Sequence, residues 1–163
     1  MALRIARLDP TRHDRDGFDC GEPSLNRYLR EQASQHQRDG IATTHVLVNE
    51  AEPTCVLGYL SLAAAQMNLP SLQSADRKRL PAYPVPAVRL ARLAVAHQAQ
   101  GRDHGRLLVG HAINLSLQLR TELGVKVIVV DALNERAAAF YRRYGFRETI
   151  DDALTLYLPL GKG

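Results

Sequence analysis

A chain of 163 residues with 45% hydrophobic content is long enough for one domain, residues 1–163, and no apolar run is long enough to cross a membrane. The net charge of +4 permits an anionic partner such as a nucleic acid, although a basic soluble surface explains the same charge. The N-terminus lacks the apolar segment of a signal peptide, so we expect a cytoplasmic protein with reduced thiols at Cys20 and Cys55. A disulfide between these two stays open.

The first half of the chain predicts one helix and a pair of strands. Apolar and small residues recur at helical spacing from Leu25 to Ala33, and a proline just before them fits the first turn of a helix. Residues 43–49 and 55–62 are short, apolar and rich in β-branched residues, so they predict two paired strands. Residues 71–86 are polar, basic and proline-containing, which predicts a connection.

The centre of the chain predicts a strand, a loop and a helix. Residues 87–97 alternate bulky apolar residues with smaller or charged ones, so we expect a central strand that leads into a glycine-containing loop. From His104 to about Leu123 the apolar residues share one helical face, and Gly124 is the expected stop of this helix.

The last third of the chain predicts two more strands around a second helix. Residues 125–132 are apolar enough for a strand buried on both sides. Residues 134–146 predict a helix ended by Gly145, and residues 153–160 predict the final strand. The order of all the elements predicts an α/β or α+β domain with a mixed sheet.

The loop between the central strand and the following helix has the composition of an anion-binding site. Gly101 and Gly105 permit positive φ and a close approach of the backbone to a ligand. At the start of a helix, free N–H groups and the helix dipole favour a phosphate. The loop matches neither the P-loop nor the dinucleotide fingerprint G-x-G-x-x-G. By itself it is equally well explained as a structural turn.

Two motifs together resemble the GNAT superfamily of acetyltransferases: RLAVAHQAQGRDHGRLL, residues 92–108, and DALNERAAAFYRRYGF, residues 131–146. In that family the loop pattern Gln/Arg-x-x-Gly-x-Gly/Ala binds the pyrophosphate of acetyl-coenzyme A. Here Gln100, Asp103 and Gly105 occupy its three named places. The segments FDCGEPSLNRYL, VLGYLSLA and YPVPAVRLARLAV resemble one branch, the tRNA-acetylating toxins of the TacT type.

This resemblance implies a fold, a cofactor and partners. The fold is the GNAT fold, a mixed central sheet with a splayed central strand flanked by helices. The acetyl donor is acetyl-coenzyme A, with no metal and no membrane association. The partners are an aminoacyl-tRNA substrate and a ribbon-helix-helix antitoxin, and a homodimer is common in the family.

The resemblance also implies roles for individual residues. Tyr141 is the general acid, and a tyrosine hydroxyl is chemically able to protonate the departing thiolate. Packing of Tyr141 as a core aromatic is the alternative, with Tyr144 as the second candidate donor. The residues implied to contact the cofactor come from the central strand, the loop and the second helix: Leu93, Ala94, Val95, Gln100, Gly101, Arg102, Asp103, His104, Gly105, Arg106, Asn134 and Phe140.

Asp103 stands where the family usually has glycine. A carboxylate facing the pyrophosphate costs about 1 to 3 kcal/mol of binding, or roughly 5- to 150-fold in affinity. Aspartate tolerates the left-handed conformation better than most residues, and at a helix start it also caps free N–H groups. We therefore expect the Asp103 side chain to point outward and cap the helix. An impaired cofactor site is the alternative.

Basic residues are the candidates for contacts with RNA phosphates, which give affinity without sequence readout. A solvated loop and an exposed helix face are the alternative explanation for them. The six histidines show no metal-ligand spacing, and His104 and His111 are expected to be ordinary helix residues. The candidate RNA-binding residues are Arg77, Lys78, Arg79, Arg89, Arg92, Arg142 and Arg143.

The sequence thus predicts an acetyl-coenzyme A-dependent N-acetyltransferase, a toxin that acetylates the α-amine of aminoacyl-tRNA and blocks translation. Two alternatives stay open. One is acetylation of a small amine or a protein amine. The other is a coenzyme A-binding regulatory module that Asp103 has disabled as an enzyme.

Overall fold

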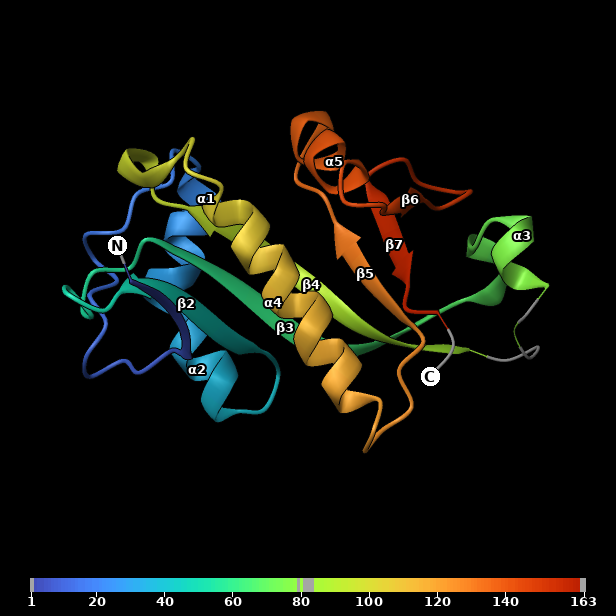
Figure 1. Cartoon of the computed structure of the whole chain (residues 1–163), viewed down its shortest axis with the longest axis horizontal. Coiled ribbons are helices and arrows are strands. Elements are labelled where there is room, and N and C mark those ends of the chain that lie inside the picture. Colours follow the sequence, from blue (N-terminus) through green and yellow to red (C-terminus); the bar gives the residue numbers. More distant parts are fainter. Residues whose placement is uncertain (1, 79, 81–83, 162–163) are drawn as a thin grey trace. The chain divides into compact units, whose positions relative to one another are not determined.

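The computed structural model describes residues 2–78, 80 and 84–161. The chain forms two compact units, the first from residues 1–63 and 91–112 and the second from residues 64–90 and 113–163. Figure 1 labels the helices and strands. Among the described residues, no helix has the length and apolar character needed to cross a membrane.

The first unit contains antiparallel strands, a helical segment between β1 and β2, the end of the central strand, and the start of the helix that follows it. Strands β1 and β2 pair through Ile5 and Leu47, and β2 pairs with β3 through Val46 and Tyr59. Buried apolar side chains from the strands and from the helical segment, among them Leu29, form its core. Its first elements are β1 (Leu3–Arg7), α1 (Pro23–Arg27), the π-helical stretch η1 (Tyr28–Gln32), α2 (Ala33–Arg38), β2 (Thr43–Asn49) and the start of β3 (Gly58–Met67).

The second unit packs short helices and strands around a core of its own. Strand β5 pairs antiparallel with β7, and β7 pairs antiparallel with β6. Val127, Val129 and Tyr157 are buried at the centre of its core. Its elements include η2 (Leu69–Ser71), α3 (Ser74–Arg77), β5 (Val127–Asp131), α5 (Glu135–Arg142), β6 (Arg147–Glu148) and β7 (Thr155–Pro159).

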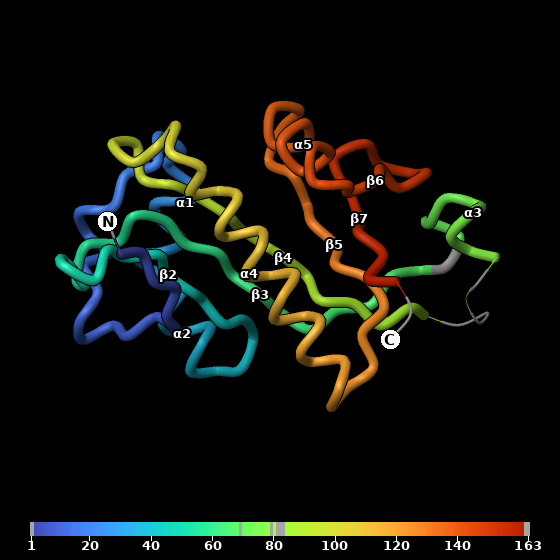
Figure 2. The backbone as a smooth tube through the Cα atoms, viewed as in Figure 1, coloured from blue at the N-terminus to red at the C-terminus, as the bar shows by residue number. Residues whose placement is uncertain are grey.

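Strand β4 (Val85–Val95) is the central strand of the sheet and runs without a break into the loop that follows it (Figure 2). It is parallel to β5, whereas the β1–β2, β2–β3, β5–β7 and β6–β7 pairs are antiparallel. Hydrogen bonds connect the strands in the order β1-β2-β3-β4-β5-β7-β6. The predicted mixed sheet is therefore confirmed.

Several details differ from the sequence prediction. Strands β1 and β6 and helix α3 had not been predicted, and the first helix contains a π-helical stretch. Helix α4 (His104–Leu119) ends earlier than expected, and Gly124 does not adopt the positive φ of a C′ glycine, so it is not the stop. Gly145, with φ of 92°, does follow the end of α5 as predicted.

Candidate functional site

The central strand β4 continues past the end of its pairing with β5, which is the backbone feature expected of a splayed strand. The β4–β5 ladder extends from Ala87 and Val127 to Leu90 and Val130, while β4 continues to Val95. The predicted cofactor-contacting residues of the strand, Leu93, Ala94 and Val95, all lie in this continuation. Backbone groups past the end of a ladder are free to pair with an extended ligand.

Gln100 braces the loop after β4. Its Nε2 donates hydrogen bonds to the carbonyl oxygens of Cys20, at 3.1 Å, and Val95, at 3.0 Å. The short helix η3 (His97–Ala99) precedes it, and the His97 backbone N–H donates to the Asp19 carbonyl at 2.7 Å. The Gln100 side-chain amide nitrogen already donates to two backbone carbonyls. Gln100 therefore fixes the conformation of the loop, in addition to being the first residue of the family's loop pattern.

Two residues of the loop adopt positive φ, Gly101 at 82° and Asp103 at 61°. Gly105, which also permits positive φ, does not adopt it, because it already belongs to α4. A side chain added at Gly101 would meet nothing within 4 Å, so the space over the loop is open. The first N–H groups of α4 have no acceptor within the helix. This local geometry fits a phosphate group.

Asp103 is exposed, as expected of a side chain that points outward, and it adopts the left-handed conformation that aspartate tolerates. The prediction that it caps α4 is wrong. A capping residue has extended φ and ψ and accepts a hydrogen bond from a helical N–H, whereas the described residues include no hydrogen bond to the Asp103 carboxylate. Its carboxylate is therefore exposed to solvent. Arg102 and Arg106, which are close to it in sequence, are also exposed.

His104 and His111 lie on α4 in different surroundings. The Nε2 of His111 lies 3.2 Å from the Nδ1 of His45, and burial lowers the pKa of both rings, that of His45 to about 4. This pair joins β2 to α4, in agreement with an ordinary structural role for His111. His104 is only 4% exposed, and neither of its ring nitrogens has a partner among the described residues.

In the second unit, Tyr141 lies in α5 and is 6% exposed. Its ring makes edge contacts with Phe140 and Phe146, with centroids 5.2 and 5.5 Å apart. Burial raises the pKa of the Tyr141 hydroxyl, so the group stays protonated at neutral pH. No hydrogen bond from the described residues occupies it. Tyr144 instead packs on Phe140, with centroids 5.1 Å apart, as its helical spacing predicts.

Asn134 is the N-cap of α5. Its Oδ1 accepts a hydrogen bond from the backbone N–H of Ala137 at 3.0 Å, which satisfies one free donor of the helix. The Asn134 side chain therefore stabilises the start of α5, and its amide nitrogen Nδ2 is available to contact a ligand. Sequence reasoning from the motif had not anticipated this capping bond.

The candidate RNA-binding arginines divide into two groups. Arg89 forms an ion pair with Asp131, and Arg142 forms ion pairs with both Glu135 and Glu148. Their charges are thus compensated within the protein. These three carboxylates were missed from the sequence, although Glu135 lies two helical turns before Arg142, where helix geometry brings side chains to one face.

The other basic residues lack a carboxylate partner among the described residues. The Arg92 guanidinium lies 3.6 Å from the centroid of the Tyr28 ring, and that of Arg143 lies 5.7 Å from the Phe140 ring. Arg77 is half-buried and Lys78 exposed on α3 and just after it. Arg79 lies outside the described residues. The Tyr28–Arg92 stack was not predicted, because nothing in the local sequence brings the two residues together.

Comparison with known proteins gives one consistent result. Residues 42–148 match the acetyltransferase (GNAT) domain family. The chain is 34% identical over 145 residues to a tRNA-acetylating toxin from Mycobacterium tuberculosis, covering 89% of this chain and 85% of that protein.

Solved structures agree with this match. A tyrosine-to-phenylalanine mutant of KacT superposes with a TM-score of 0.92 at 30% identity, covering 98% of this chain and 96% of KacT. AtaT complexed with acetyl-methionyl-tRNA superposes with a TM-score of 0.90 at 30% identity, covering 97% and 95%. A mutant AtaT bound to the C-terminus of the antitoxin AtaR and acetyl-CoA gives 0.83 at 29% identity, covering 97% and 93%.

Proposed function

Because the chain belongs to the GNAT family of acetyltransferases, we propose that it transfers the acetyl group of acetyl-coenzyme A to the α-amine of aminoacyl-tRNA. The observation that carries the proposal is the presence, in one chain, of an open phosphate-type loop and a buried, protonated tyrosine on α5. The likeness to a tRNA-acetylating toxin and to tRNA-bound AtaT supports this choice of acceptor.

The residues that would hold acetyl-coenzyme A are those of the loop and of the strand before it. Gly101 and the N-terminus of α4 offer backbone N–H groups to the pyrophosphate, and Arg102 and Arg106 add positive charge. The continuation of β4 past Leu90 offers backbone partners to the pantetheine arm. Bound there, the coenzyme supplies a thioester that an amine can attack.

Tyr141 is the proposed general acid. The neutral amine attacks the thioester carbonyl, the carbon–sulfur bond breaks, and the Tyr141 proton passes to the departing thiolate. The proton that the amine loses restores the hydroxyl. Burial suits this role because it keeps the hydroxyl protonated until the thiolate forms. Mutants that exchange a tyrosine for phenylalanine are among the solved structures of both KacT and AtaT, which supports a central role for a tyrosine.

The chemistry of the acceptor favours an α-amine. An α-amino group has a pKa of about 7.7–8.0, against about 10.4 for lysine, so an appreciable fraction is neutral at pH 7 without a catalytic base. Acetylation converts this amine to an amide, whose nitrogen is a poor nucleophile for peptide-bond formation. The proposed outcome is therefore a block of translation, which places the activity in the cytoplasm.

The RNA would be held by the basic residues that the protein leaves without carboxylate partners. The basic residues proposed to contact phosphates are Arg77, Lys78, Arg92 and Arg143, because none of them has a carboxylate partner among the described residues. Arg89 and Arg142 are not proposed as contacts, because their charges are already compensated. The net charge of +4 is in keeping with an RNA substrate.

The proposed protein partner is a ribbon-helix-helix antitoxin, as the complex of AtaT with the C-terminus of AtaR supports. An antitoxin that covers Tyr141 or the proposed RNA-contacting residues would silence the enzyme until it is removed. A homodimer, common in the family, is the proposed assembly of the toxin.

The experiment that tests the proposal is incubation of the purified protein with labelled acetyl-coenzyme A and total charged tRNA. We expect label on the amino acid released from the tRNA, which also identifies the amino acid. Label on free amines without any RNA requirement would instead favour a small-amine acetyltransferase. Coenzyme binding without turnover on any acceptor would favour a regulatory module.

A further inference from the structure

Arg92 lies in the first unit, where the face of an aromatic ring holds its guanidinium. The guanidinium carbon lies 3.6 Å from the centroid of the Tyr28 ring, and Arg92 is half-buried. Among the residues that the structure describes, none forms an ion pair with Arg92 or accepts a hydrogen bond from it. A guanidinium that stacks on a ring keeps its N–H groups in the plane of the stack, where a phosphate can bind two of them.

The Tyr28 ring is itself fixed on several sides. It is 2% exposed, and its hydroxyl oxygen lies 3.1 Å from the Nδ1 of His36. The Tyr59 ring stacks on it with centroids 6.4 Å apart, and the Tyr59 hydroxyl donates to the Leu25 carbonyl at 2.6 Å. Strand β3 and the helical segment are thereby joined around this ring. A ring with so little freedom presents its face to Arg92 in one orientation.

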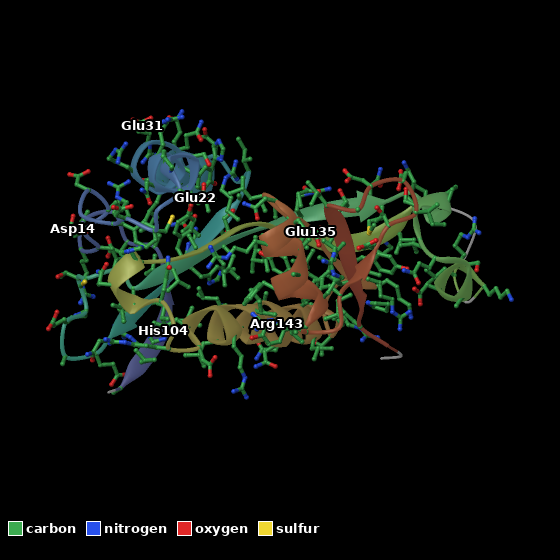
Figure 3. All side chains as sticks on the ribbon, turned by 90° about the horizontal axis from the view of Figure 1, so that it is seen from above. Asp14, Glu22, Glu31, His104, Glu135 and Arg143 are labelled. Atoms are coloured by element: carbon green, nitrogen blue, oxygen red, sulfur yellow. The ribbon has the colours of Figure 1, made fainter. Side chains whose placement is uncertain are left out.

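Tyr28 belongs to the π-helical stretch η1. The backbone N–H of Ala33 donates to the Tyr28 carbonyl, five residues earlier. Wide helical turns of this kind are rare and occur frequently at functional sites. Glu31 in the same stretch (labelled in Figure 3) is exposed and pairs with Arg30, with 3.8 Å between their charged atoms. The acidic side chain of this stretch is therefore not the partner of Arg92.

Arg92 also lies next to the part of β4 that is proposed to hold the pantetheine arm. That part includes Leu93, so consecutive residues of one strand carry the arginine and the coenzyme contacts. The pantetheine arm ends in the thioester, which the α-amine of the acceptor must reach. In aminoacyl-tRNA this amine is attached to the terminal ribose, close to the last phosphates of the single-stranded CCA end. A phosphate contact at Arg92 is therefore expected at this end and not in the distant stem.

We propose that Arg92 binds a phosphate of the single-stranded 3′ end of the RNA and that Tyr28 is the residue that positions it. The identity of this ligand rests on the proposed function, which takes aminoacyl-tRNA as the acceptor. Two parallel N–H groups bind a phosphate well only when the guanidinium plane is held in one orientation. Tyr28 supplies this orientation through the face of its ring. The first unit thus recognises the backbone of the CCA end, whatever the attached amino acid.

The test compares acceptors that differ in the phosphates near the amine. Steady-state rates are measured with charged tRNA, with the aminoacylated trinucleotide CCA and with an aminoacyl ester of adenosine, which has no phosphate. Arg92→Gln should raise the KM for charged tRNA and for the trinucleotide by about tenfold each, with little change in kcat. It should not alter kcat/KM for the adenosine ester. An effect on charged tRNA alone would place the Arg92 contact away from the 3′ end and overturn the proposal.

Variants of Tyr28 separate positioning from simple support of the core. Tyr28→Leu should raise the KM for the trinucleotide several-fold in the parent and should have no further effect when combined with Arg92→Gln. Tyr28→Phe should stay within about twofold of the parent, because the ring face attracts the cation. Phe18→Leu is the matched control, since it truncates another aromatic side chain of the same core and should leave this KM unchanged. Additive effects of Tyr28→Leu and Arg92→Gln would overturn the positioning role.

A binding measurement separates the phosphate contact from the proposed function. Uncharged CCA trinucleotide is titrated into the full chain while the side-chain Nε–H signal of Arg92 is followed by NMR, and adenosine is titrated as the control. The trinucleotide should shift the signal and adenosine should not. No shift with the trinucleotide would overturn the phosphate contact, whatever the turnover. A shift without turnover on any of the three acceptors would contradict the proposed function and retain the contact.

Discussion

Two groups of arginines, one in the second unit and one near the loop of the first unit, differ in their partners. In the second unit, arginines are neutralised by acidic residues in three places: Arg89 with Asp131, Arg142 with Glu135 and Glu148, and Arg147 with Asp76. Near the loop of the first unit, Arg92 and Arg102 have no carboxylate partner among the described residues, and His104 has no hydrogen-bond partner there.

This difference separates charges that hold the fold from charges available to ligands. An arginine already paired with two carboxylates gains little from a phosphate, because it must first lose its partners. A guanidinium stacked on an aromatic ring keeps its N–H groups free and is fixed in direction. In the second unit, Arg143 on α5 belongs to the second kind, since it lies over Phe140 with no carboxylate partner among the described residues.

The largest expected effect is that of Tyr141→Phe. Loss of a general acid should reduce turnover by about 10²- to 10⁴-fold, while the affinity for acetyl-coenzyme A stays nearly intact. Single-turnover rates and calorimetric titration measure the two quantities. Tyr144→Phe is the matched control and should retain activity, because this ring packs on Phe140. A Tyr141→Phe rate within threefold of the parent would show that another group is the acid.

The next prediction compares the two arginines of β4, of which Arg89 has a carboxylate partner and Arg92 has none among the described residues. Arg92→Gln should raise the KM for charged tRNA by about tenfold and reduce its salt dependence by about one unit of slope. Arg89→Gln, three residues away on the same strand, should change the KM less than about twofold, because Asp131 already compensates its charge. Equal effects of the two variants would contradict the proposal that only arginines without a carboxylate partner contact the RNA.

Asp103→Gly should increase both the affinity for the coenzyme and the stability of the protein, whereas loss of a helix cap would lower the stability. Removal of the exposed carboxylate should tighten acetyl-coenzyme A binding by about fivefold at low salt. Glycine adopts a φ of 61° without the cost that a side chain carries, so the variant should also be more stable by up to about 1 kcal/mol. Calorimetry and thermal unfolding measure both. Unchanged affinity at low salt would mean that the carboxylate does not face the phosphates.

Arg142→Gln should affect stability and not RNA binding. The variant loses two surface ion pairs, which together contribute about 1 kcal/mol, or a Tm lower by about 2–4 °C. Arg143→Gln, its neighbour in sequence, should leave the Tm unchanged and raise the KM for charged tRNA. Reversal of these two results would assign the RNA contact to Arg142.

The smallest effect at neutral pH comes from the His45–His111 pair. The pKa of His45 lies at about 4 in the folded protein and near 6.5 when unfolded, so folding favours the neutral ring. Its contribution to stability is complete above pH 6.5 and is lost as the pH falls toward 4. Urea unfolding should therefore show a steeper loss of stability over this range in the parent than in His45→Gln. Parallel curves would contradict the assignment.

Local patterns in the sequence predicted the mixed sheet and the two main helices. They did not predict β1, whose five residues alternate too briefly to stand out, or β6, which has two. Contacts distant in sequence were also missed. Arg89 and Asp131 are 42 positions apart, and no local pattern joins them. The capping role expected of Asp103 failed because its backbone conformation excludes it.

The central claim is that the acceptor is the α-amine of aminoacyl-tRNA. The most direct measurement compares charged with uncharged tRNA as acceptors, using the parent protein and Tyr141→Phe, and analyses the released amino acid by mass spectrometry. We predict an N-acetylated amino acid only from charged tRNA, formed by Tyr141→Phe at least about 10²-fold more slowly than by the parent. Acetylation of the RNA without an attached amino acid, or equal acetylation of the free amino acid, would contradict the account.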